Sequence, residues 1–194
     1  MWLRRQIPKI ACPVSPPECA YGWLEGSWSC LKFSDKVCTD GSGGLHSSDK
    51  ELRRCGWSAV QLAEGKPVGE WSWVASPLEG AQQTVPRAEL PAVIMVVENA
   101  CGELEFRTDH QNTVTTVVSR GWAKAMRSTN SDFWERLKTG IDHCPWRVTF
   151  HWVNSHPTEA LEVQTEIPEM VYRGNRRADK LARQAADTIE LLPT

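Results

Sequence analysis

Residues 35–44, Asp-Lys-Val-Cys-Thr-Asp-Gly-Ser-Gly-Gly, combine a short apolar run with an acidic residue and a cluster of glycines. The first six residues predict a strand that ends at Asp40, and the glycines that follow predict a turn. Two further segments, 55–62 and 70–76, have a β-rich composition and partial alternation, and polar loops that contain glycine separate the three segments. Together they predict an antiparallel meander.

Helices and strands interleave after this meander. Residues 88–101 are apolar and rich in helix-forming types, and Gly102 is expected to end that helix. Pro91 fits the first turn but would kink a helix that began as early as Pro86. Composition and periodicity further predict a strand at 104–108, helices at 109–125 and 132–141, a strand at 147–153 and a helix at 174–192. The order βββ-α-β-α-α-β-α predicts an α/β fold with helices packed on a mixed sheet.

The composition is that of a globular protein. Of the 194 residues, 41% are hydrophobic and 24% are charged, which excludes a wholly disordered or fibrous chain. The length suits one domain of about 150 residues with an appendage. Residues 1–34 hold four of the twelve prolines and show no sustained period. We therefore expect an irregular Pro/Trp-rich leader followed by one domain at 35–194.

The sequence favours an intracellular protein, in the nucleus or the cytoplasm, with no membrane partner. No run of about 18 apolar residues predicts a transmembrane segment, and the first residues lack the long apolar stretch of a secretory signal. The seven cysteines are odd in number and scattered in spacing, so we expect reduced thiols. A zinc-dependent interaction module built on them is a weaker alternative, because the cysteines form no CxxC pair.

Four carboxylates are expected near the ends of strands or in the early turns of helices: Asp40, Glu89, Asp109 and Asp179. Each alone has an ordinary explanation, since carboxylates are favoured near helix N-termini and in turns. With one histidine, however, they stand in five ordered motifs. These are Thr39-Asp40-Gly41-Ser42, Arg87-Ala88-Glu89-Leu90, Thr108-Asp109-His110-Gln111, Trp152-Val153-Asn154-Ser155-His156 and Asn175-Arg176-Arg177-Ala178-Asp179-Lys180-Leu181-Ala182.

The five motifs closely resemble those of the type 1 ribonuclease H family, whose hallmarks are TDGS, (R/M)-x-E-L, TDSQ, W-V-x-G-H and N-x-x-A-D-x-L-A. The match spans residues 35–187. The resemblance implies a ribonuclease H-like fold with a five-stranded mixed sheet whose first three strands are antiparallel. It also implies an enzyme, an endonuclease that hydrolyses the RNA strand of RNA–DNA hybrids.

The resemblance further implies that the four carboxylates bind two divalent ions, normally Mg²⁺, with Mn²⁺ as a substitute. Asp40 would contact both ions, Glu89 and Asp109 one of them, and Asp179 the other. Hard oxygen ligands suit Mg²⁺, and two ions about 4 Å apart can activate water and neutralise a leaving oxygen. Four clustered carboxylates would repel one another without metal, so we expect raised pKa values at this site.

His156 matches the histidine of the family's flexible loop, which is thought to assist proton transfer and product release. An imidazole that titrates near neutrality suits that role. The 23 residues from His156 to Asp179 exceed the family's usual spacing. The extra segment, 157–170, carries four Glu and no Lys or Arg. Such an acidic insert is unexpected beside a phosphate-binding site, so an ordinary loop histidine is the alternative.

Substrate contacts are also implied by the resemblance. In the family, backbone amides and small side chains after the first Asp face the RNA 2′-hydroxyls, a role that falls here on Gly41, Ser42 and Gly43. Gln111 matches a residue that reaches into the minor groove. Arg176 is expected to contact phosphate, and a solvated helix face is the alternative. A short basic stretch stands where some members carry a basic protrusion: Arg120, Lys124 and Arg127.

The short basic stretch and the leader favour a retroelement origin, in which this domain, expected to be monomeric, would follow a reverse transcriptase or another module. A catalytically silent domain that binds nucleic acid or acts as a scaffold is the alternative, supported by Pro91 beside Glu89 and by the acidic insert. The net charge of −2 argues at first against a nucleic-acid partner. When the four proposed metal ligands and the four glutamates of the insert are left out, the net charge of the remaining residues is +6, which suits an RNA–DNA hybrid.

Overall fold

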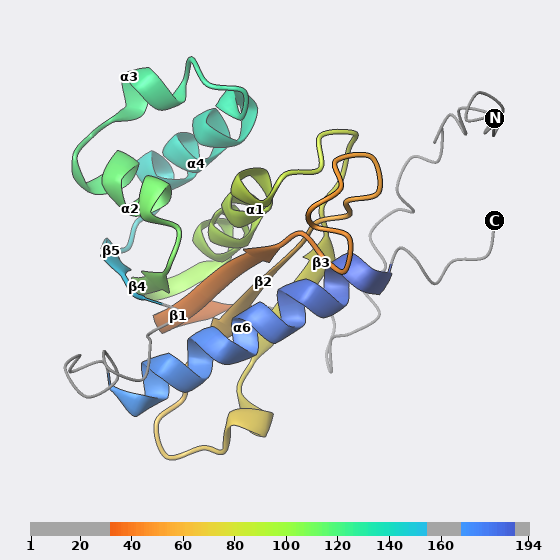
Figure 1. The fold of residues 1–194 in the computed structure, drawn as a ribbon. Coiled ribbons are helices and arrows are strands. Elements are labelled where there is room, and N and C mark those ends of the chain that lie inside the picture. Colours follow the sequence, from red (N-terminus) through yellow and green to blue (C-terminus); the bar gives the residue numbers. More distant parts are fainter. Residues whose placement is uncertain (1–31, 155–167, 189–194) are drawn as a thin grey trace, which may run out of the picture.

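A five-stranded mixed sheet lies at the centre of the fold (Figure 1). The computed structural model describes residues 32–154 and 168–188. The strand order is β3-β2-β1-β4-β5, with β1, β2 and β3 antiparallel and β1, β4 and β5 parallel. The strands are β1 (Phe33–Ser42), β2 (Gly56–Gln61), β3 (Trp73–Pro77), β4 (Ala100–Thr108) and β5 (Val148–Trp152). The predicted α/β class, with three antiparallel strands first, is confirmed.

The helices cover both faces of this sheet. They are α1 (Val85–Glu98), α2 (Gln111–Val118), α3 (Trp122–Ala125), α4 (Ser131–His143) and α6 (Glu169–Thr188), with a 3-10 turn, η2, at Val68–Glu70. Figure 1 shows α1 on one face, with α4 stacked beyond it, and α6 on the other. None of the helices within the described ranges combines the length and the hydropathy that crossing a bilayer requires.

Alternation along β1 builds two separate apolar cores. Val37 belongs to the core under α1, where the rings of Phe106 and Phe150 stack with centroids 4.6 Å apart. The next residue, Cys38, belongs to the smaller core under α6. Since successive side chains of a strand point to opposite faces, the central strand is apolar on both sides. This burial fixes the position of Asp40, two residues further along the same strand.

Small residues bring α6 very close to the sheet. A Cβ on Gly56 would lie 2.4 Å from both Ala182 O and Ala186 N, so only glycine allows this approach. Beside it, the Ser58 hydroxyl on β2 donates a hydrogen bond of 2.7 Å to the carbonyl of Ala178. The helix that carries Asp179 is therefore fixed against the strand next to Asp40.

The boundary between α1 and β4 corrects two predictions. The helix was expected at 88–101 with Gly102 as its stop, but α1 ends at Glu98 and Gly102 lies within β4. Phe33 N donates to Asn99 O, and Phe33 pairs with Ala100. Pairing with β1 therefore makes residues from Ala100 onward a strand, although their composition favours a helix. Sequence propensity is local, whereas this pairing depends on a segment far away in the chain.

Pro91 lies inside α1, because the helix begins at Val85. Pro86 stands at its start, where a missing N–H costs nothing. Pro91 has no N–H to donate to the carbonyl of Arg87, so one intrahelical hydrogen bond is absent. The helix nevertheless continues to Glu98.

The single helix predicted at 109–125 is wrong. The segment forms α2 and α3, separated by a turn in which Arg120 adopts a φ of 52° and Gly121 N donates to Thr116 O. A non-glycine residue in the left-handed region ends a helix. The helix predicted at 174–192 begins earlier, at Glu169, and the predicted insert 157–170 therefore contributes its last two residues to α6. Most of that insert and of the predicted leader 1–34 lies outside the described residues.

Candidate metal centre

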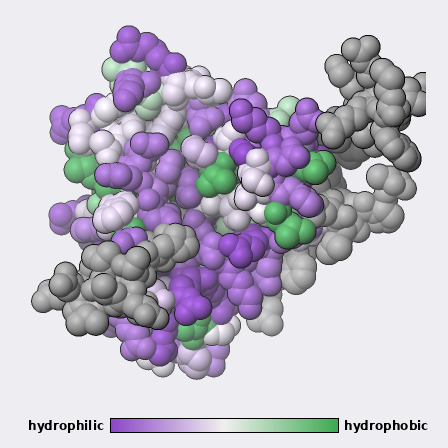
Figure 2. All heavy atoms as spheres, in the orientation of Figure 1, coloured by the Kyte–Doolittle hydropathy of each residue, from purple (hydrophilic) through white to green (hydrophobic). Residues whose placement is uncertain are grey.

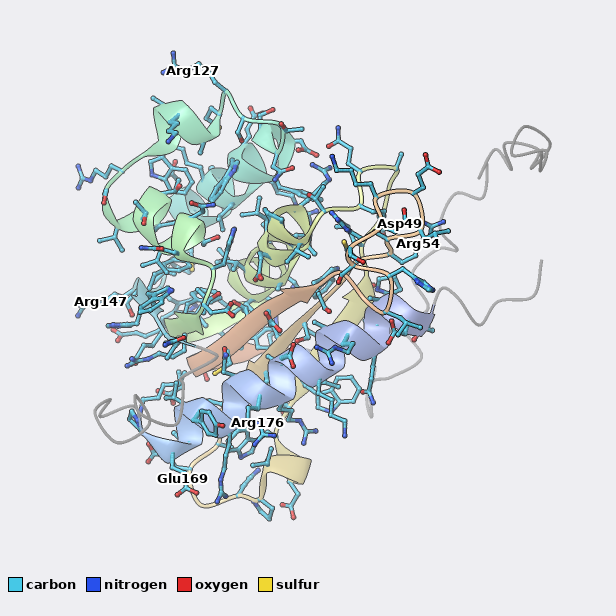
Figure 3. The ribbon with its side chains drawn as sticks, viewed as in Figure 1. Asp49, Arg54, Arg127, Arg147, Glu169 and Arg176 are labelled. Atoms are coloured by element: carbon cyan, nitrogen blue, oxygen red, sulfur yellow. The ribbon has the colours of Figure 1, made fainter. Side chains whose placement is uncertain are left out.

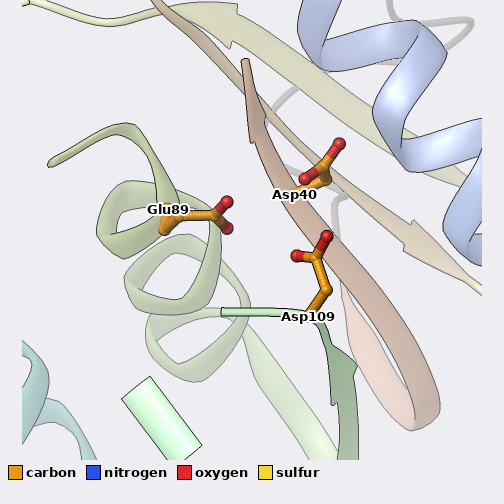
Figure 4. Close-up of side chains that lie close together, drawn as sticks. All are labelled: Asp40, Glu89 and Asp109. Carbon is orange, nitrogen blue, oxygen red and sulfur yellow. The ribbon is translucent and has the colours of Figure 1, made fainter. Parts of the chain in front are cut away.

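Three carboxylates meet at one end of the sheet (Figure 4). Asp40, Glu89 and Asp109 each offer an oxygen, and the three oxygens lie within 4.8 Å of one another. Asp40 is 6% exposed, Glu89 is 5% exposed and Asp109 is half-buried. Within the described ranges this is the one group of three or more His, Cys, Asp or Glu residues that could hold a metal ion.

Strand pairing brings Asp40 and Asp109 together. Thr39 on β1 pairs with Thr108 on β4, and the two strands are parallel. Asp40 and Asp109 each directly follow one residue of this pair. They therefore lie at the carboxyl ends of two neighbouring strands. The indole Nε1 of Trp152 on β5 donates to the carbonyl of Asp109 at 3.1 Å, which fixes the backbone at this point.

A glycine contact brings Glu89 to the same place. A Cβ on Gly41 would lie 2.8 Å from Glu89 N and 3.0 Å from the carbonyl carbon of Ala88, so α1 packs directly on the backbone after Asp40. Glu89 lies in the second turn of α1 and its side chain is directed toward the end of β1 (Figure 4). Its Oε2 is buried and has no hydrogen-bond partner among the described residues.

The electrostatics of the cluster favour protonation or a bound cation. Burial raises the pKa of Asp40 well above its usual range, and the charges of Asp109 and Asp179 raise it further. Burial likewise raises the pKa of Glu89, together with the charges of Asp40 and Asp109. The hydrogen bond from the backbone amide of Gly41 lowers the pKa of both carboxyls, but by less than burial and the neighbouring charges raise it. The expectation of raised pKa values is met at these two carboxyls.

The donor set fits a hard divalent cation. All three ligands are carboxylate oxygens, the type that Mg²⁺ prefers, and no thiol or imidazole takes part in the group. The unpartnered Oε2 of Glu89 is a buried acceptor that a cation would satisfy. These residues therefore suit magnesium or manganese better than zinc.

Asp179 lies near the cluster but outside the group of three. It stands on α6, and its charge raises the pKa of Asp40, which places the two carboxylates within electrostatic reach. The Arg183 guanidinium lies 3.9 Å from Asp179, and 41% of the Asp179 side chain is exposed. Asp179 is thus more open than the buried Asp40 and Glu89, and solvent reaches its side of the centre.

The expected substrate residues within the described ranges come from β1, the residue after it, α2 and α6. Gly41 and Ser42 end β1, and Gly43 follows them. Gln111 is the exposed first residue of α2. Arg176 projects from the exposed side of α6, with its guanidinium 5.7 Å from the ring of Tyr172. The face that carries α6 is mostly hydrophilic (Figure 2).

Other basic residues are placed differently. Arg127 lies beside α3, far from Arg176 at the opposite end of the view in Figure 3. Arg177 donates to the carbonyl of Val68 and so attaches η2 to α6. Arg173 pairs with Glu169 one turn earlier on α6. His156 lies outside the described residues.

Three residues near the centre were not singled out from the sequence. Ser58 holds α6 through Ala178. Asn175, one turn before Asp179, is 4% exposed, and its Oδ1 has no partner in the part of the chain that the structure describes. Burial lowers the pKa of His110 to about 4, and its Nδ1 lies 2.7 Å from Thr113 Oγ1. Asn175 and His110 each stand in one of the ordered motifs, and this could have marked them as site residues. Nothing local marks Ser58.

Metal-free protein is expected to lose stability as the pH rises. The raised carboxyl pKa values mean that the folded state holds protons that the unfolded chain releases at about pH 4. Stability should therefore be greatest below about pH 4 for these two groups and should decline through the raised pKa values. Thermal unfolding in a chelator, at about pH 5 and about pH 8, measures this difference.

Magnesium should reverse that loss. At ten times its dissociation constant the ion would add about 1.4 kcal/mol at about pH 8, and less at about pH 5 where protons compete for the oxygens. Asp40→Asn removes one titrating member and should reduce both the pH dependence and the effect of magnesium. A magnesium effect that is equal at both pH values in wild type and variant would contradict this account of the cluster.

Comparison with known proteins agrees with this geometry. Residues 35–187 match the family model of RNase H. A ribonuclease H of Schizosaccharomyces pombe is 30% identical over 120 residues, covering 58% of this chain and 40% of that protein. This chain thus spans less than half the length of that relative.

Two solved structures share the fold. Prototype foamy virus protease–reverse transcriptase superposes with a TM-score of 0.57 and 20% identity, over 82% of this chain and 21% of the viral one. LC11-RNase H1 in complex with an RNA/DNA hybrid superposes with a TM-score of 0.53 and 19% identity, over 79% of this chain and 96% of the other. Because the family model matches residues 35–187, which include all three clustered carboxylates and nearly all of the sheet and α6, the chain belongs to the RNase H family.

Proposed function

We propose that this protein hydrolyses the RNA strand of RNA–DNA hybrids with the help of divalent cations. The observation that carries the proposal is the triad of buried Asp40, buried Glu89 and half-buried Asp109, whose oxygens lie within 4.8 Å of one another. The free energy cost of gathering three carboxylates without a cation is high, and a purely structural role does not require it. The hybrid bound to LC11-RNase H1, a protein of the same fold, supports the choice of substrate.

We further propose that two ions bind, with Asp40 between them, Glu89 and Asp109 on one side and Asp179 on the other. Cations held by these carboxylates would supply the chemistry of water activation and of neutralising charge on a leaving oxygen. The open position of Asp179 supports this division, because a substrate phosphate needs access to the centre from that side. Mg²⁺ is the expected ion, and Mn²⁺ should substitute for it.

The remaining site residues would bind and orient the hybrid. The backbone at Gly41, Ser42 and Gly43 adjoins Asp40 and would face the RNA 2′-hydroxyls, which distinguish RNA from DNA. Gln111 would reach the minor groove, and Arg176 would hold a phosphate. His156 would assist proton transfer and product release.

The viral relative suggests a larger context. Prototype foamy virus protease–reverse transcriptase carries this fold within a much longer chain. We propose that this domain likewise acts with a reverse transcriptase or another module, which would supply affinity beyond that of its own short basic stretch.

Cleavage of labelled nucleic acids tests the proposal. RNA–DNA hybrid, single-stranded RNA, duplex RNA and duplex DNA are incubated with the protein in Mg²⁺ or in Mn²⁺. We expect cuts only in the RNA strand of the hybrid, because recognition needs 2′-hydroxyls on one strand of a duplex. Folded protein that leaves the hybrid intact with both ions would contradict the proposal and favour the silent alternative. Pro91, which supported that alternative, does not remove Glu89 from the triad.

A further inference from the structure

The loop that follows Asp40 is held by the far end of α6. Leu45 N donates a hydrogen bond of 2.9 Å to Asp187 Oδ1, across 142 residues of sequence. Gly44, with a φ of 65°, lies against the same residue, since a Cβ there would be 2.9 Å from Asp187 Oδ1 and 3.0 Å from Ala186 Cβ. Figure 1 shows this loop beside the C-terminal turn of α6.

The loop leads directly from the metal centre. The backbone from Gly41 to Leu45 is fixed at both ends, by α1 at Gly41 and by Asp187 at Leu45. Within the loop, Ser42 Oγ accepts a hydrogen bond from Gly44 N. A glycine-rich segment has much conformational freedom to lose on ordering. A hydrogen bond that orders it before substrate arrives lowers the free energy cost of binding.

We propose that Asp187 is a positioning residue for substrate recognition: it fixes the backbone of residues 41–45 so that their amides meet the RNA 2′-hydroxyls. This role rests on the proposed function, and it is separate from metal binding because Asp187 stands two turns beyond Asp179 on α6. The same helix thus carries a proposed metal ligand and the acceptor that orders the recognition loop.

The test uses two substitutions and a matched control. Asp187→Ala removes the acceptor, whereas Asp187→Asn keeps an oxygen that can accept from Leu45 N. Asp142→Ala removes another exposed helical acid, one that pairs with Lys138 on α4. Two quantities are measured for each protein: amide hydrogen exchange of residues 41–47, and kcat and KM for hybrid cleavage.

Asp187→Ala should accelerate exchange in the loop and raise KM about tenfold, with kcat within about twofold, because a hydrogen bond to a charged group is lost without touching the metal ligands. Asp187→Asn should stay within about twofold of wild type in both quantities, as should Asp142→Ala. Unchanged exchange and KM in Asp187→Ala, or an Asn variant as impaired as the Ala variant, would overturn the proposal. If wild type cleaves no hybrid, the proposed function fails and the recognition role with it, while the exchange data still decide whether Asp187 holds the loop.

Discussion

Asp40→Asn is expected to reduce hybrid cleavage by a factor of about a thousand or more. The charges of Asp109 and Asp179 both raise the pKa of Asp40, so Asp40 lies within electrostatic reach of both. Its loss would therefore disturb both sides of the proposed centre. Asn is nearly isosteric and keeps one acceptor oxygen, but it has no negative charge to hold a divalent cation. Single-turnover cleavage of a labelled hybrid in saturating Mg²⁺ measures the effect on the chemical step.

The same substitution should stabilise the metal-free protein. Removing one member of a repelling, buried carboxylate group should raise the free energy of unfolding near pH 7 by about 1 kcal/mol. A substitution in a functional cluster raises stability and lowers activity. A substitution in a structural cluster lowers both stability and activity. Asp142→Asn, at an exposed site on α4, is the control and should change neither. An Asp40→Asn protein that folds and cleaves at more than a tenth of the wild-type rate would contradict the account.

Gly56→Ala is expected to destabilise the fold by about 3 kcal/mol. The added Cβ would lie 2.4 Å from the backbone of α6 at Ala182 O and Ala186 N, where no flexible side chain can move aside. The helix would have to shift, and Asp179 would move with it away from Asp40. We therefore expect a lower midpoint of thermal unfolding and a parallel loss of hybrid cleavage.

Gly69→Ala is the matched control for that substitution, because no atom of the described residues lies within 4 Å of a Cβ at this position in η2. It should leave stability and cleavage within experimental scatter of wild type. A Gly56→Ala protein as stable as Gly69→Ala would mean that α6 does not approach β2 as closely as described.

The class of fold could be predicted because its signals are local. The apolar run before Asp40 and the glycines after it mark a strand end, and the period of Ala178, Leu181, Ala182 and Ala185 marks a helix. The start of β4 could not be predicted, because Ala100 becomes part of a strand only through pairing with Phe33. The break at Arg120 could not be predicted either, since a positive φ at arginine has no signature in the sequence.

The carboxylate cluster was identifiable from ordered motifs, since each acid lies beside a recognisable strand end or helix start. The residues that support it were not. Ser58 matters only because α6 lies against β2, and Asp187 only because the loop after Asp40 reaches that helix. Both are polar residues in unremarkable surroundings, and their partners lie more than a hundred residues away. Sequence patterns report neighbours in the chain, whereas these roles depend on neighbours in space.

The most direct test of the central claim, that this cluster holds divalent cations, is an anomalous difference map from a crystal of the protein grown with Mn²⁺. We expect a peak about 2 Å from carboxylate oxygens of Asp40, Glu89 and Asp109, with a second peak between Asp40 and Asp179 when a hybrid is bound. Crystals of Asp40→Asn grown in the same way should show neither peak. A wild-type map with no density among the three carboxylates, or with manganese bound elsewhere while the protein cleaves hybrid, would contradict the claim.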